Sequence, residues 1–158
     1  MVRRRSIAAS VAALALLLFV SLPSVLAAPA HTAVFRLALT GDQEATPTCA
    51  PPAICGDPDA EGAMILIVNP VRDTVCFLTR WTDIDGTVVA AHIHLAPVGV
   101  AGGVVVPLFE GPLESDDKIR GCVSANGHAA AILADPSAYY VNIHSTLFQP
   151  GAIRAQLG

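Results

Sequence analysis

The amino-acid sequence predicts an all-β fold, an antiparallel β-sandwich with Greek-key-like connections or a barrel, and one short helix. Short apolar, β-branched runs alternate with polar residues at the period of a half-buried strand. Gly, Pro, Asn and Asp separate these runs at nearly regular intervals, which is typical of sandwiches. Of the 158 residues, 53% are hydrophobic and 14% charged, a composition that suits one compact β domain after an N-terminal apolar segment.

That first segment, residues 1–27, has the features of a cleaved secretory signal peptide. Arg3, Arg4 and Arg5 give a basic start, residues 7–20 are apolar, and small residues follow. We expect cleavage after residue 27, with alternatives up to residue 30, and a mature domain of residues 31–158. No other apolar run reaches the ~20 residues that span a bilayer. We therefore expect no transmembrane segment in the mature domain, and a secreted, periplasmic or extracellular location.

Eight strands are expected in the mature domain, each ended by turn residues. In chain order they cover residues 34–39, 62–68, 74–81, 88–95, 104–109, 118–124, 139–144 and 152–157. Pro107 lacks a backbone N–H, so its strand is expected at a sheet edge or at a bulge. Residues 127–134 are rich in alanine and stop before Asp135 and Pro136, which predicts the one short helix.

Four cysteines follow the signal segment, and an even number in an exported chain predicts two disulfides. Of the three pairings, we favour Cys49–Cys55, because these residues bracket a small Pro-rich loop. Cys76 and Cys122 each lie in an expected strand and would then join two strands. A thiolate metal site would need closer spacing and reducing conditions.

The charged residues indicate what the domain does not bind. Three of the nine basic residues lie in the signal segment, so the mature domain is more acidic than the net charge of −4 of the whole chain. The remaining basic residues are scattered along the sequence, and we expect no nucleic-acid partner. Arg154 is expected to form an internal ion pair with Glu44 or Asp42; the alternative is that Arg154 and Glu44 contact a ligand.

Three histidines form the main candidate site. His92 and His94 alternate within one expected strand and share a face, and His144 ends another strand. If the two strands lie together, three imidazoles can hold one copper or zinc ion and leave a fourth position open. If they do not, each histidine is a buried residue that donates to a backbone carbonyl. His31 and His128 are interpreted as bystanders.

Four segments of the chain also match a known pattern. They are residues 35–47 (FRLALTGDQEATP), 90–99 (AAHIHLAPVG), 139–145 (YYVNIHS) and 150–157 (PGAIRAQL). In this order they resemble the CHRD domain, which is repeated in the developmental antagonist chordin and occurs singly in secreted bacterial proteins. Ala155 departs from the family, which usually has glycine before the terminal Gln-Leu.

The resemblance implies a β-sandwich and, from the role of the chordin repeats, an extracellular protein or matrix component as partner. It supplies no enzyme activity. A looser similarity links the chain to copper/zinc superoxide dismutases, which are secreted β-sandwiches with a His-x-His strand pair. We therefore predict an extracytoplasmic binding or structural module that can hold one copper or zinc ion. The alternative is a mononuclear metal enzyme with superoxide dismutase-like chemistry.

Overall fold

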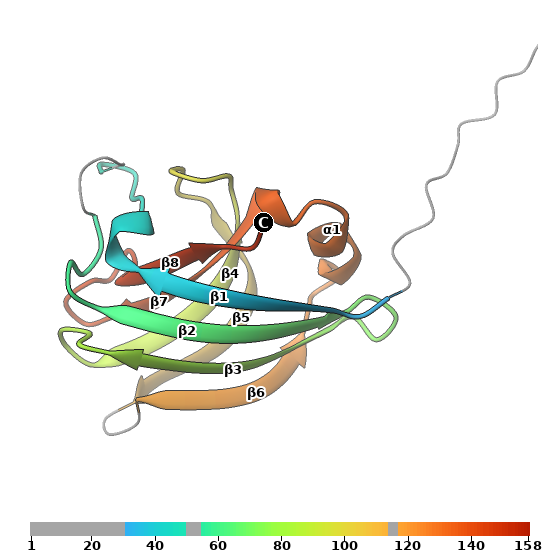
Figure 1. Cartoon of the computed structure of the whole chain (residues 1–158), viewed down its shortest axis with the longest axis horizontal. Coiled ribbons are helices and arrows are strands. Elements are labelled where there is room, and N and C mark those ends of the chain that lie inside the picture. The colour runs from blue at the N-terminus through green and yellow to red at the C-terminus, as the bar shows by residue number, and fades with distance from the viewer. Residues whose placement is uncertain (1–30, 50–54, 114–116) are drawn as a thin grey trace, which may run out of the picture.

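The computed structural model describes residues 31–49, 55–113 and 117–158 (Figure 1). The expected signal peptide, residues 1–27 with cleavage up to residue 30, lies outside the described residues. Short helices accompany the strands: the 3-10 helices η1 (Gly41–Gln43) and η2 (Pro136–Ala138), and α1 (Ala129–Ala134). The strands are β1 (Ala33–Thr40), β2 (Glu61–Asn69), β3 (Thr74–Thr82), β4 (Val88–Leu95), β5 (Gly103–Leu113), β6 (Lys118–Ser124), β7 (Tyr139–Ser145) and β8 (Ile153–Gln156).

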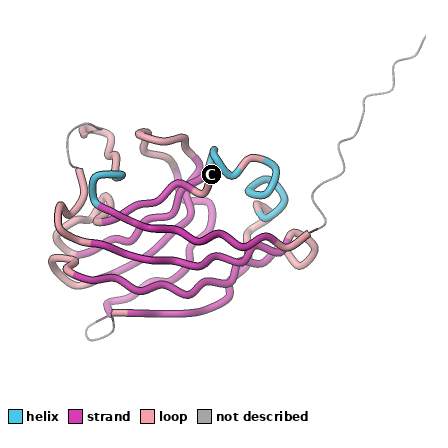
Figure 2. The backbone as a smooth tube through the Cα atoms, viewed as in Figure 1, coloured by secondary structure: helices cyan, strands magenta, loops and turns pink. Residues whose placement is uncertain are grey.

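The eight strands form one antiparallel sheet in the order β5-β4-β7-β8-β1-β2-β3-β6. This sheet curls round on itself, as the tube in Figure 2 shows. Its edge strands β5 and β6 come into contact. Asn126, just after β6, donates from Nδ2 to the Val105 carbonyl of β5 at 3.3 Å. The antiparallel all-β fold with one short helix is thus confirmed. Its two layers are halves of one continuous sheet, whereas a sandwich has two separate sheets.

Alternation along the strands explains how the core forms inside this curled sheet. In β2, Met64 and Leu66 point inward and are buried, whereas Ile65 between them is exposed. Opposite halves of the sheet meet through aromatic rings: Phe109 of β5 lies 6.1 Å from Phe77 and 6.3 Å from Trp81 of β3, between ring centroids. Rings of this size bury much apolar surface, so these contacts hold the two halves together.

The helix α1 closes one end of the core with Ala129 and Ile132, both buried. Its start is fixed by Asp73, whose carboxylate accepts hydrogen bonds from the backbone N–H of Gly127 at 2.7 Å and of Ala129 at 3.3 Å. Gly127 has a φ of +84°, a left-handed conformation that glycine adopts without strain. The helix begins two residues later than residue 127 because this turn occupies them. In the described part of the chain, no helix is long and apolar enough to span a membrane.

Both disulfides have the pairing that the sequence favours. Cys49–Cys55 closes the Pro-rich loop, and Cys76–Cys122 joins the neighbouring strands β3 and β6. Pro107 lies in the edge strand β5, where the pairing with β4 shifts register beside His92. This placement agrees with its missing N–H.

The strand β7 differs from the others because every one of its residues is buried. One face packs in the core through Val141 and Ile143. Its other face lies beneath two loops, residues 96–102 and 146–152, whose carbonyls accept hydrogen bonds from side chains of β4, β7 and β8. Together with the same face of β4 and β8, this covered outer face carries half of the eight buried polar or charged residues in the described part of the chain: His94, Asn142, His144 and Arg154.

Candidate metal centre

The candidate site lies on the covered outer face of β4, β7 and β8, which are neighbours in the sheet. In the register, His92 pairs with Asn142 and His94 pairs with Tyr140, whereas Ala90 pairs with His144. Residues two apart in a strand face the same way, so both strands present histidines on this one face. The intervening residues Ala91, Ile93 and Ile143 fill the core on the other side.

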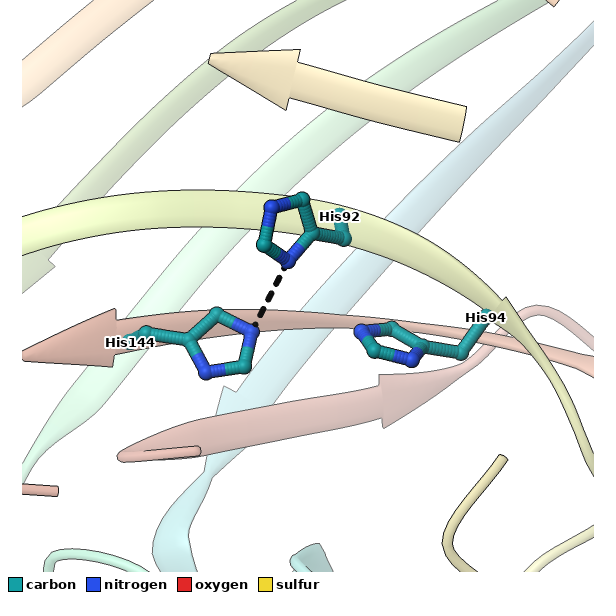
Figure 3. Close-up of side chains that lie close together, drawn as sticks. All are labelled: His92, His94 and His144. Carbon is teal, nitrogen blue, oxygen red and sulfur yellow. Dashed lines mark hydrogen bonds between the residues drawn. The ribbon is translucent and has the colours of Figure 1, made fainter. Parts of the chain in front are cut away.

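The structure brings His92, His94 and His144 together (Figure 3). One ring nitrogen of each lies within 4.8 Å of the others. Nδ1 of His92 is 3.1 Å from Nε2 of His144, and Figure 3 shows the ring of His94 turned toward this pair. Metal–nitrogen bonds are about 2 Å long. Small side-chain rotations are therefore enough for the three nitrogens to share one ion.

Backbone carbonyls fix the position of the ring proton in two of the histidines. Nδ1 of His94 donates to the Gly102 carbonyl at 2.9 Å, and Nδ1 of His144 donates to the Gln149 carbonyl at 2.9 Å. A carbonyl can only accept, so in each neutral ring Nε2 keeps a free lone pair. Metal-binding histidines use such carbonyls to hold the ring and its tautomer. Nε2 of His94 is buried and has no hydrogen-bond partner among the residues that the structure describes.

Burial keeps these three imidazoles neutral. It lowers the pKa of His92 from 6.5 to about 4, with smaller contributions from His144 and His94. It also lowers the pKa of His94 and of His144, although the hydrogen bonds to Gly102 and Gln149 act in the opposite direction. A metal ion binds the neutral ring, because protonation removes the lone pair. All three rings are therefore uncharged at neutral pH, as metal binding requires.

These hydrogen bonds make a prediction for the metal-free protein at pH 7. His94 and His144 should both be neutral with the proton on Nδ1. Since Nε2 of His144 then accepts, His92 should also carry its proton on Nδ1. Long-range ¹H–¹⁵N spectra of the imidazoles distinguish the two tautomers. A proton on Nε2 of His94 or His144 would contradict the geometry described above.

Tyr140 stacks on His94, and Arg154 in turn lies against the ring of Tyr140. The rings of His94 and Tyr140 have centroids 4.7 Å apart and planes 6° apart. The guanidinium of Arg154 lies 3.4 Å from the centroid of the Tyr140 ring. The Tyr140 hydroxyl accepts from the backbone N–H of Gly102 at 3.2 Å, the same residue whose carbonyl holds His94. Loop 96–102 and His94 are therefore positioned together.

Arg154 is 1% exposed, and its hydrogen bonds connect β8 with this loop. It donates to the carbonyls of Val100 and Pro97, each at 2.9 Å, and to Oε1 of Gln156 at 3.0 Å. The predicted partner, Glu44, interacts with it electrostatically: the charge of Arg154 lowers the pKa of Glu44. The hydrogen-bonding role of Arg154 is thus to hold the loop that covers the histidines.

Glu44 is itself fully buried, and within residues 31–49, 55–113 and 117–158 neither carboxylate oxygen has a hydrogen-bond partner of normal geometry. Burial raises its pKa from 4.5 to about 7, more than the nearby amide of Asn142 and the charge of Arg154 lower it. Gly151 passes so close that a Cβ there would lie 2.2 Å from Oε1 of Glu44. This carboxyl group is therefore enclosed beside the histidine cluster.

Sequence reasoning identified the three histidines and singled out Arg154, but it missed the other groups that support the histidines and the connection of Arg154 with them. Gly102 and Gln149 act through backbone carbonyls, which leave no signature in the side-chain pattern. Tyr140 and Arg154 lie on the same side of the sheet as the histidines. This follows from the alternation of side chains along a strand, once the pairing of β4, β7 and β8 is known.

Comparison with known proteins gives one match. The family model described as the CHRD domain matches residues 35–157, a stretch that includes the three histidines, Glu44 and Arg154. No curated protein and no solved structure matches the chain.

Proposed function

The chain belongs to the CHRD domain family, and on this basis we propose that it is an exported binding module that holds one copper or zinc ion at His92, His94 and His144. The observation that carries the metal site is the Nε2 atom of His94. This atom is buried, faces the other two rings and finds no hydrogen-bond partner in the described part of the chain. Buried polar atoms in native proteins nearly always have a partner, and a bound ion would supply it.

The ligand set favours copper or zinc over harder cations, because neutral imidazole nitrogens suit these two metals. Three protein ligands would leave a fourth position for water or another ligand, where the ion would act as a Lewis acid or, if copper, as a redox centre. His92 is less buried than His94 and His144, so it marks the side of the cluster nearest to solvent. The chain's own contribution is to keep three rings neutral and oriented.

Two further features support the exported location. Residues 1–27 have the charge and hydropathy pattern of a signal peptide, with cleavage up to residue 30. The described residues contain two disulfides, which persist in oxidising compartments and are rare in reducing ones. An extracellular protein or matrix component is the class of partner that we propose for such a module.

Metal analysis of the purified mature domain tests the site. We expect the metal-free protein, loaded with Cu²⁺ or Zn²⁺ and desalted, to retain about one ion per chain by mass spectrometry. His92→Ala/His94→Ala should retain almost none, because two of three ligands are lost. His128→Ala is the matched control, since His128 lies at the start of α1 and outside the cluster, and it should bind as the native protein does.

Failure of the native protein to retain either metal would refute the metal site. Equal retention by the double variant would place the ion elsewhere. A superoxide-consumption assay on the loaded protein tests the alternative function, a mononuclear metal enzyme with dismutase-like chemistry. Activity that follows the metal content and disappears in His92→Ala/His94→Ala would favour this enzyme over a plain binding module.

A further inference from the structure

The half of the sheet formed by β1, β2, β3 and β6 has an outer surface that we call the basic–apolar face. It is centred on one row of paired residues: Arg36 pairs with Ile65, Ile65 with Leu78, and Leu78 with Arg120. Across the four strands the order is therefore cation, apolar, apolar, cation. Ile65 is 36% exposed and Leu78 is 50% exposed, so the apolar centre of the row lies open to solvent.

The neighbouring rows of paired residues add further exposed apolar side chains and further basic side chains to this face. On one side, Val34 and Ile67 are 48% and 40% exposed and continue the apolar strip. On the other side, the small residues Ala38 and Ala63 leave a hollow of about 640 Å³, lined also by Arg80 and Lys118. A contiguous exposed apolar strip with a polar rim is typical of an interaction surface.

The fold gathers basic residues that are far apart in the sequence. Four of the six basic residues in the described part of the chain lie on this face: Arg36, Arg80, Lys118 and Arg120. The sequence interpretation that these residues form no cluster is thus corrected, because strand pairing places them together. The nearest carboxylate on the same strand face, Glu61, lies one row beyond Ala63. Among the described residues, this face therefore gathers positive charge in an otherwise acidic domain, with Glu61 and Asp117 beside Arg80 at one end.

This charge pattern selects among possible occupants. A second copy docked through the same face would bring like charges together across the interface. The aliphatic centre contributes nothing to the binding of nucleic acid, whose recognition uses phosphate contacts and base stacking. The complementary partner is apolar along its middle and acidic on both flanks.

The spacing of the cations indicates the shape of that partner. Arg36 and Arg120 lie on strands three positions apart, and the spacing of ~4.8 Å between strands puts their backbones about 14 Å apart. An α-helix with its side chains is about 10–12 Å wide, so one helix fits between the two cations. We propose that the basic–apolar face binds an amphipathic helix of a partner protein, its apolar stripe on Ile65 and Leu78 and its acidic residues beside the flanking cations. This proposal is independent of the metal site.

A synthetic helical peptide tests the proposal on the intact mature domain. The probe is a fluorescein-labelled amphipathic peptide of about 18 residues with a leucine stripe at helical spacing and glutamate on both flanks. Its control has the same stripe with lysine on both flanks. We expect fluorescence anisotropy to show that the glutamate peptide binds at least tenfold more tightly, and that added salt weakens its binding.

Charge reversal on the protein makes the test specific for this face. Arg36→Glu/Arg120→Glu should reverse the preference, so that the lysine peptide binds more tightly than the glutamate peptide. Arg72→Glu is the matched control, since Arg72 is exposed in the turn between β2 and β3 and should leave the preference unchanged. Equal thermal midpoints would show that all three proteins are folded.

Three results would overturn the proposal. They are a lack of binding by both peptides, equal binding of the two, and an unchanged preference in the charge-reversed variant. Binding to phosphatidylglycerol vesicles tests a different occupant, an anionic membrane surface. Binding to these vesicles that the double variant loses, without binding of the glutamate peptide, would replace the helix by an anionic membrane surface as the occupant.

Discussion

Replacing Arg154 with alanine should lower the free energy of unfolding by about 3–5 kcal/mol, although the residue lies outside the hydrophobic core. The side chain is 1% exposed, stacks on Tyr140 and donates to the carbonyls of Val100 and Pro97. Its removal leaves a cavity and buried carbonyls without donors, both of which are costly. Urea unfolding with the disulfides intact measures the loss.

Arg72→Ala provides the matched control, since Arg72 is exposed and should change stability by less than about 0.5 kcal/mol. Hydrogen exchange adds a local test. Loop 96–102 should exchange faster in Arg154→Ala under conditions where the core strands remain protected, because the arginine ties this loop to β8. A loss of stability below about 1 kcal/mol, with unchanged exchange in the loop, would show that Arg154 does not hold the cover of the histidine site.

Replacing Glu44 with glutamine should make the metal-free protein more stable at pH 8 by about 3 kcal/mol, and leave its stability nearly unchanged near pH 4. Burial raises the pKa of Glu44 to about 7, above its ordinary value of 4.5. Between these values the folded state binds more protons than the unfolded state, so the contribution of Glu44 to stability is lost as the pH rises through this window. Glutamine has nearly the same shape and does not titrate.

The comparison of the two proteins isolates this effect from other titrations. The histidines of the cluster have lowered pKa values and produce the opposite trend, but they are present in both proteins and cancel in the difference. Urea unfolding at several pH values between 4 and 8 gives the curve. A difference between Glu44→Gln and the native protein that does not change with pH would mean that folding does not raise the pKa of Glu44.

The sequence predicts the strands well because their signal is local. Alternation along β2 and β3, and turn residues between the strands, depend on neighbours a few positions away. The pairing of Cys76 with Cys122 was also accessible, since each lies in a strand. What the pattern does not contain is the order of strands in the sheet, which depends on contacts between distant segments. These contacts between distant segments also decide whether the strands form one curled sheet or two packed sheets.

The same limit applies to the two surfaces. Three histidines were recognised from their spacing, but their convergence required β4 and β7 to be neighbours. The carbonyls of Gly102 and Gln149 are supplied by loops, and their positions follow from the tertiary structure alone. Arg36 and Arg120 are 84 positions apart in the sequence, so only the β1-β2-β3-β6 arrangement reveals that they flank one apolar strip.

The position of β8 in the sheet determines when this domain can be completed. This strand comes last among the strands in the chain, yet it lies between β7 and the first strand, β1. A polypeptide that leaves a translocation channel with its N-terminus first therefore cannot close the sheet until Ile153–Gln156 has emerged. Arg154 belongs to that strand, so its hydrogen bonds to loop 96–102 form only when β8 joins the sheet. If the chain is exported and binds a metal as proposed, the complete histidine site would form, and take up its ion, only after export.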